Sequence, residues 1–186
     1  LRRLLVQPRE LTEPHTIVPP RTRVVTESSP PNKASMDLHK LLAGIERLDY
    51  ADVERELSLL AALLPPRELV HRVMLPLLQK VGDAWHAGNL SIAQEHMTSA
   101  LLRNVLGALV PLHRRATPPA KLLFATPARE QHEFGILLAA MLAVGGGLGI
   151  VYLGTNLPGD EIVTAAQKTA PQAVVLGLMG AEDARV

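Results

Sequence analysis

The sequence contains no cysteine, and only 3% of its residues are aromatic, with a single tryptophan among them. Without cysteine, disulfides, thiolate zinc sites and cofactors attached through thioethers are all excluded. No uninterrupted apolar run reaches the ~18–20 residues that cross a bilayer, so we expect no membrane contact and a cytoplasmic protein. A formal net charge of +1 argues against a protein that coats nucleic acid with its whole surface. Hydrophobic residues make up 47% of the chain, which is enough for a globular core.

Proline is concentrated in residues 1–35, which hold six of the fifteen prolines in the chain. Proline interrupts helices, and the polar residues between the prolines offer no core, so residues 1–35 are predicted to be a linker or arm. The sequence begins with Leu1 and ends at Val186, directly after a strand-like run. We therefore expect it to be part of a longer protein.

Residues 36–113 show apolar side chains at steps of three and four, the spacing of amphipathic helices. The first predicted helix runs from Met36 through Leu48, and the second ends at Leu64, before two prolines. A third helix follows, and Pro76 inside it is expected to bend it.

The end of the third helix and the start of the fourth carry recognisable capping residues. Gly88 is predicted to be the left-handed residue that ends the third helix. Ser91 and Gln94 are predicted to form a capping box at the start of the fourth. Four amphipathic helices with short connections predict a four-helix bundle over residues 36–113.

Residues 119–186 alternate between strand-like and helical runs. The strand-like runs are KLLFAT, LGIVYLG and QAVVLGLM, and the helical runs between them are EFGILLAAMLAV and GDEIVTAAQKT. This order predicts a parallel, doubly wound, Rossmann-like sheet, whose ligands bind at the carboxyl ends of the strands. The predicted fold class is therefore α/β with an all-α cap. Three strands are few for such a sheet, so we expect it to continue past Val186.

The run EQHEFG, residues 130–135, follows the first predicted strand. His132 can present one ring nitrogen to a ligand, while Glu130 accepts a hydrogen bond from the other and fixes the tautomer. Gly135 would let a bulky planar ligand approach the backbone. A histidine in a polar loop is more often an ordinary surface residue, so this run alone leaves both interpretations open.

A second stretch with candidate site residues is WHAGNLSIAQEH, residues 85–96. Trp85 offers a large flat face for stacking, and Glu95 can accept hydrogen bonds from hydroxyl groups. His86 and His96 are possible ligands or orienting groups. The structural alternative is a tryptophan that anchors a helix end, with histidines on a solvated surface.

Glu130-x-His132-x-x-Gly135 after a strand resembles the D/E-x-H-x-x-G signature of cobalamin-binding domains, in which the histidine binds cobalt from below. The run GIVYLGTNLPGDEI, with Gly154 and Thr155, looks like the second strand and loop of such a domain. The resemblance implies that these residues contact the cofactor.

The bundle is similar to the helical cap of the CarH/LitR-type light-sensing regulators, where a Trp is followed after nine residues by Glu-His. Trp85, nine residues and then Glu95-His96 fit that spacing, and His86 follows the Trp as in CarH-type proteins. The resemblance implies that Trp85 and Glu95 cover the 5′-deoxyadenosyl group and that His86 becomes the upper cobalt ligand after light. Gly177 stands where this family has a Ser or Thr near the cofactor's nucleotide tail.

The resemblance implies a non-enzymatic, adenosylcobalamin-binding light sensor of a transcriptional regulator. Light would cleave the cobalt–carbon bond, change the packing of the two parts and change the state of a homo-oligomer. DNA would be read by an N-terminal MerR-type domain that these 186 residues do not include. One alternative is a corrinoid protein that shuttles methyl groups between methyltransferases, which a Trp over the upper face disfavours. Another is a photoreceptor that also holds a bilin, bound without a covalent link because cysteine is absent.

Overall fold

The computed structural model describes residues 33–179, and their side chains from Leu38 onward. Most of the predicted arm, residues 1–32, and the last residues, 180–186, lie outside the described residues. Helix α1 (Lys33–Glu46) begins three residues earlier than predicted. The last proline before it is Pro31, so nothing in the three residues after Asn32 stops a helix.

The turn between the first two helices corrects one prediction. Leu48 does not continue α1 but has φ 55° and is 49% exposed. A residue in this left-handed conformation ends a helix, because the following backbone leaves the helical path. Helix α2 (Tyr50–Leu63) then begins after Asp49, whose side chain accepts a hydrogen bond from the backbone N–H of Asp52.

The third predicted helix is present as three consecutive pieces: α3 (Pro66–Leu69), the π-helical turn η1 (Val70–Met74) and α4 (Leu75–His86). Pro76 has no N–H to donate to the preceding turn, and its ring crowds that turn. The backbone hydrogen bonds of the helix shift by one residue here. The N–H of Leu75 donates to the carbonyl of Val70, five positions back instead of four. The irregularity predicted at Pro76 therefore takes the form of a π-turn.

The end of α4 has the predicted left-handed glycine. Gly88 has φ 73°, and its N–H donates to the carbonyl of Trp85, while the N–H of Asn89 donates to that of Ala84. These two bonds form a Schellman motif, which satisfies the last free carbonyls of the helix.

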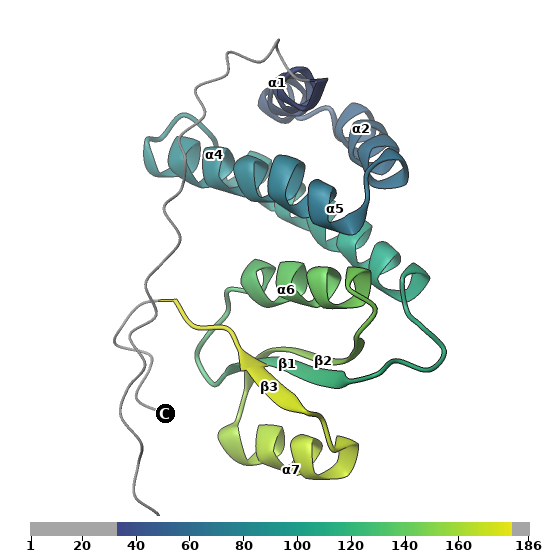
Figure 1. Ribbon diagram of the computed structural model, residues 1–186. Coiled ribbons are helices and arrows are strands. Elements are labelled where there is room, and N and C mark those ends of the chain that lie inside the picture. Colours follow the sequence, from purple (N-terminus) through teal and green to yellow (C-terminus); the bar gives the residue numbers. More distant parts are fainter. Residues whose placement is uncertain (1–32, 180–186) are drawn as a thin grey trace, which may run out of the picture. The chain divides into compact units, whose positions relative to one another are not determined.

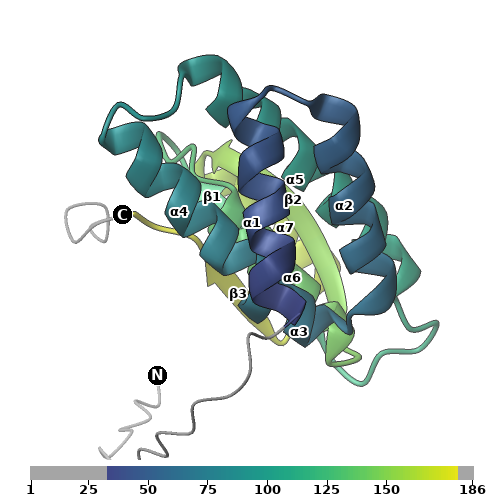
Figure 2. The same cartoon turned by 90° about the horizontal axis from the view of Figure 1, so that it is seen from above.

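Helix α5 (Ile92–Leu112) begins with the predicted capping box. The Ser91 hydroxyl accepts a hydrogen bond from the backbone N–H of Gln94, and the Gln94 side chain accepts one from the N–H of Ser91. The Gln94 amide also donates to the carbonyl of Glu46 at the end of α1, at 2.8 Å. One side chain thus starts α5 and holds it against α1. Figure 2 shows α1 lying between α2 and α4, both of which it contacts.

The rest of the described chain forms a parallel sheet with a helix on each face. The strand order is β2-β1-β3, so the central strand is the first. Helix α6 packs between the sheet and the bundle, and α7 packs on the opposite face (Figure 1). The elements are β1 (Lys121–Pro127), α6 (Phe134–Gly145), β2 (Gly149–Leu157), α7 (Gly159–Thr169) and β3 (Ala173–Leu176). The predicted fold class, an α/β sheet with an all-α cap, is confirmed.

The main hydrophobic core is continuous from the bundle to the sheet. Leu57 and Leu101 of the bundle belong to the same buried cluster as Met141 of α6 and Phe124 of β1. A smaller cluster around Ile162 lies under α7. Because the bundle shares its core with α6, α5 is held over the carboxyl end of β1. Within residues 33–179, no helix has both the length and the apolar character that crossing a membrane requires.

Candidate cofactor site

The site lies where the sheet changes winding direction. From β1 the chain crosses by α6 to β2 on one side, and from β2 it crosses by α7 to β3 on the other. The carboxyl ends of β1 and β3 therefore form a topological switch point, which is where open α/β sheets bind ligands. Residues 128–133 leave β1 at this point.

Glu130 is the buried centre of this loop, with only 6% of its surface exposed. Its Oε1 accepts hydrogen bonds from the backbone N–H of His132 at 2.8 Å and from the His132 ring Nδ1 at 2.5 Å. Its Oε2 accepts the backbone N–H of Met179, just after β3, at 2.8 Å. One carboxylate therefore joins the loop after β1 to the end of β3.

The hydrogen bonds keep Glu130 ionised in spite of its burial. The backbone N–H of His132, followed by the His132 ring, lowers the pKa of the Glu130 carboxyl from 4.5 to about 2. Burial acts in the opposite direction but is outweighed, because hydrogen bonds to the charged form favour it. The buried carboxylate is thus a permanent acceptor at neutral pH.

His132 has one free ring nitrogen as a consequence. An ionised carboxylate only accepts, so Nδ1 carries the proton of the neutral ring and Nε2 keeps its lone pair. The His132 side chain is 65% exposed. The predicted hydrogen bond between Glu130 and His132 is present, and it presents Nε2 as a possible metal ligand.

A second set of hydrogen bonds, which the sequence did not reveal, holds the backbone of the loop. The fully buried Thr126 hydroxyl donates to the Glu130 carbonyl at 2.6 Å and accepts the Asn156 N–H at 2.9 Å. The Asn156 side chain accepts the N–H of Arg129 at 2.8 Å. Arg129 and Asn156 both have positive φ. The available signals were a polar residue near the end of an apolar strand and an Asn near the end of the next strand, since Asn tolerates positive φ.

A cavity of about 400 Å³ separates this loop from the bundle. From α5 it is lined by Glu95, His96 and three further residues, and from the other side by His132 and its neighbours. Glu95 accepts a hydrogen bond from the Ser99 hydroxyl at 2.6 Å, and His96 Nε2 lies 3.8 Å from its other oxygen. The structure thus brings Glu95 and His96 of the predicted site together with His132 across one cavity.

Trp85 and His86 do not line that cavity. Trp85 is 44% exposed at the end of α4, and its ring meets the His86 ring edge-on, with centroids 4.9 Å apart. His86 Nδ1 lies 2.8 Å from the carbonyl of Gly82, to which it donates, so Nε2 of the neutral ring is free. Their predicted position over the cofactor stays a prediction.

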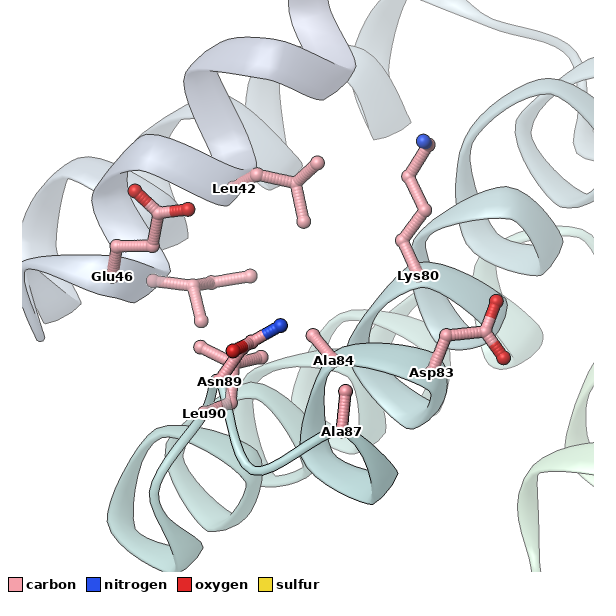
Figure 3. Close-up of a pocket in the computed structure, with 9 residues that line it drawn as sticks. Leu42, Glu46, Lys80, Asp83, Ala84, Ala87, Asn89 and Leu90 are labelled. Carbon is pink, nitrogen blue, oxygen red and sulfur yellow. The ribbon is translucent and has the colours of Figure 1, made fainter.

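A separate cavity of about 450 Å³ lies between α1 and α4 (Figure 3). Glu46 lies on α1, and Lys80 and Asp83 lie on α4. These three side chains do not point toward one another (Figure 3). By helical spacing this cavity lies on the side of α4 away from Gly82 and His86. It contains no histidine and is not part of the candidate site.

The predicted glycines fall into two groups. A Cβ on Gly135 or Gly154 would meet no atom within 4 Å, and Gly154 has φ 87° at an irregularity of β2, beside the half-buried Thr155. A Cβ on Gly177 would instead lie 2.6 Å from Ile136 Cγ2. Gly177 is therefore required by the close approach of the β3 end to α6, whereas Gly135 and Gly154 leave open space.

Gly177→Ala is expected to destabilise the protein by about 1–3 kcal/mol, the usual cost of overpacking a filled site. Ile136 and the Thr126 methyl, 3.1 Å from the new Cβ, would both have to move. Urea unfolding measures the change, with Gly135→Ala as the matched control that meets nothing. Equal stability of the two variants would contradict a packing role for Gly177.

Comparison with known proteins connects this geometry to a family. Residues 38–110 match the family model described as B12 binding domain. The chain is also 31% identical over 147 residues to the HTH-type transcriptional repressor CarH of Myxococcus xanthus, covering 77% of this chain and 48% of CarH. Residues 38–110 are thus related to B12 binding domains, and the chain is related to CarH over most of its own length.

A second curated relative and one solved structure are also similar to this chain. The CarH-related chain is 25% identical over 139 residues to the HTH-type transcriptional repressor CarA of Myxococcus xanthus, covering 75% of this chain and 46% of CarA. It therefore spans about half the length of the curated relatives it matches. The monomethylamine corrinoid protein of Methanosarcina barkeri has the same fold, with a TM-score of 0.62, 21% identity, and coverage of 80% of this chain and 72% of that one.

The residues of this CarH-related protein fit a corrinoid better than a bare metal ion. Among residues 33–179, no three His, Asp or Glu side chains gather closely enough to hold a metal. A corrinoid brings most of the ligands of its cobalt with it, so the protein would need to supply only one nitrogen. His132 Nε2 offers one, and no other atom lies within 4 Å of a Cβ placed on Gly135 or Gly154.

Proposed function

We propose that this chain binds adenosylcobalamin, with His132 Nε2 as the lower cobalt ligand, and serves as the light-sensing module of a transcriptional regulator. The observation that carries the proposal is the Glu130–His132 pair at the β1–β3 switch point. Glu130 fixes the ring through Nδ1 and leaves Nε2 free, and His132 lines the cavity below α5. Coupled histidine–carboxylate pairs are the usual way in which proteins orient a metal-binding imidazole.

The other site residues have defined roles under this proposal. Gly135, Gly154 and Thr155 would border the cofactor from the sheet side, and Gly177 would keep the β3 end close to them. Glu95, held by Ser99, would accept hydrogen bonds from the adenosyl ribose, with His96 beside it. When bound, adenosylcobalamin supplies a cobalt–carbon bond that light can break.

The residues at the end of α4 are proposed to act above the cofactor. Trp85 has an exposed face that can stack on the adenosyl group. His86 is proposed as the upper cobalt ligand after light, because its Nδ1 is occupied by the Gly82 carbonyl and its Nε2 is free. We further propose a homo-oligomer whose DNA contacts belong to a helix-turn-helix domain, because CarH and CarA are both HTH-type repressors.

A methyl-shuttling corrinoid protein is the second candidate. It is favoured by the position of Trp85, which is 44% exposed and lies outside the cavity of Glu95 and His132. An open upper side would let partner enzymes reach the cobalt. Under this candidate His86 does not bind cobalt after illumination, so the effect of His86 on the lit spectrum separates the two proposals.

Green light is expected to change the absorption spectrum of the adenosylcobalamin complex irreversibly. His86→Ala is expected to leave dark affinity within about twofold of the parent, since the residue lies outside the cavity, and to give a different lit spectrum. His71→Ala, an exposed histidine of η1, is the control. A complex unchanged by light would favour the shuttle, and absorption bands foreign to cobalamin in the isolated protein would indicate a bilin.

A further inference from the structure

The residue after His132 connects the loop to the bundle. Glu133 Oε2 accepts a hydrogen bond from Arg103 Nε of α5 at 2.7 Å. Its Oε1 accepts the Tyr152 hydroxyl of β2 at 3.1 Å. One carboxylate thus joins three segments of the chain, and we call Arg103, Glu133 and Tyr152 the clamp.

The clamp is partly buried, and its three residues line a cavity of about 300 Å³. The Glu133 side chain is 20% exposed and Tyr152 is half-buried, so the hydrogen bond between them is less screened than that of a surface pair. The Arg103 side chain is 51% exposed, so its bond to Glu133 is closer to the surface. Burial, and then the negative charge of Glu133, raises the pKa of Tyr152 above its ordinary range, so its hydroxyl stays a donor. The Arg103 guanidinium also lies 5.8 Å from the centre of the Phe134 ring. Arg103 therefore contacts both residues that follow His132.

Arg103 lies eight residues after Glu95 on the same helix, which is about 12 Å along the axis at 1.5 Å per residue. Glu95 and Arg103 both line the cavity that contains His132. The clamp therefore connects α5, which carries Glu95, to the loop that carries His132.

We propose that Arg103 and Glu133 are positioning residues, which set where the His132 loop lies relative to α5 and so hold His132 at the distance that cobalt ligation requires. The inference rests on the proposed function for its ligand, but the clamp itself is testable without cobalamin. The simpler alternative is an ion pair that only stabilises the fold, which would leave His132 in place when broken.

The reporter without cobalamin is the backbone N–H of His132, which is hydrogen-bonded to Glu130 Oε1. In hydrogen exchange of the cobalamin-free protein, Arg103→Glu and Glu133→Arg should each speed exchange of this amide on the order of tenfold, the loss of a charge-assisted hydrogen bond. The double variant with both reversals should restore slow exchange. Arg72→Glu, which breaks the exposed pair with Glu68 on η1 and α3, is the matched control and should change nothing at His132.

The reporter with cobalamin is the absorption signature of histidine ligation. Each single reversal should lower the histidine-bound fraction at saturating adenosylcobalamin, and the double variant should restore it. Unchanged His132 exchange in the single variants overturns the clamp, whatever cobalamin does. Faster exchange with full histidine ligation overturns the positioning role, and a parent that binds no cobalamin overturns the proposed function alone. If a reversal prevents folding, Tyr152→Phe, which removes one donor and keeps the ring, carries the same two measurements.

Discussion

His132→Ala is expected to weaken adenosylcobalamin binding on the order of 100-fold or more. Loss of a residue that only orients a metal ligand costs 10–100-fold in metal affinity, and the loss of the ligand itself should cost at least as much. A 100-fold loss corresponds to about 2.7 kcal/mol of binding free energy. Equilibrium titration in the dark, followed by absorption, measures the dissociation constant.

The control for this variant is His39→Ala, which removes an exposed histidine of α1 and should bind as the parent does. The His132 side chain is largely exposed, so its removal should leave the fold intact. An affinity within threefold of the parent would remove His132 from the role of lower ligand. The cofactor would then have to keep its own base or use another residue.

Glu130→Gln is expected to weaken cobalamin binding by about 10–100-fold while His132 remains in place. The carboxylate accepts three hydrogen bonds, two on one oxygen and one on the other. A Gln side chain has only one acceptor oxygen. In either orientation of the amide, its NH₂ group faces an N–H donor that the carboxylate would have accepted. The ring proton of His132 or the N–H of Met179 therefore loses its partner, and the ring is no longer held with Nε2 free.

The matched control is Gln131→Ala, a change at the exposed neighbour that should cost much less. Because Glu130 acts through His132, Glu130→Gln combined with His132→Ala should bind no worse than His132→Ala alone. Additive losses in the double variant would show that Glu130 acts on the cofactor by another route.

The Glu130 variant also has a signature in acid. The pKa of Glu130 in the folded protein, about 2, lies below its ordinary 4.5. The stability contributed by the ionised carboxylate is thus fully present above about pH 4.5 and is lost as the pH falls toward about 2. Urea unfolding between pH 6 and pH 3 should show a steeper loss of stability for the parent than for Glu130→Gln. Parallel curves would contradict the hydrogen bonding seen here.

Features decided by neighbouring residues could be predicted from the sequence. The Schellman turn at Gly88 and the capping box of Ser91 and Gln94 depend on side chains within a few positions of one another, and both are present. The Glu130–His132 hydrogen bond spans two residues and was predicted for the same reason. Periodicity was sufficient for the helices and strands, apart from Leu48. This residue is apolar, as a helix face requires, but its positive φ ends the helix.

Features decided by distant residues could not be predicted. The Arg103–Glu133 pair joins positions 30 apart, and the contact that excludes a side chain at Gly177 comes from Ile136. Neither leaves a periodic pattern, because each depends on how α5 and β3 pack on α6. The cofactor roles of Trp85 and His86 depend on a cofactor that the fold alone does not position, so they stay predictions.

The most direct test of the account is electron paramagnetic resonance of the protein loaded with cobalamin in its Co(II) form, with ¹⁵N incorporated only in histidine. An axial nitrogen splits each cobalt line into three when it is ¹⁴N and into two when it is ¹⁵N. The account predicts doublets in the labelled parent and their loss in His132→Ala. Triplets in the labelled parent would show that the cofactor's own base stays on the cobalt, and would contradict His132 as its lower ligand.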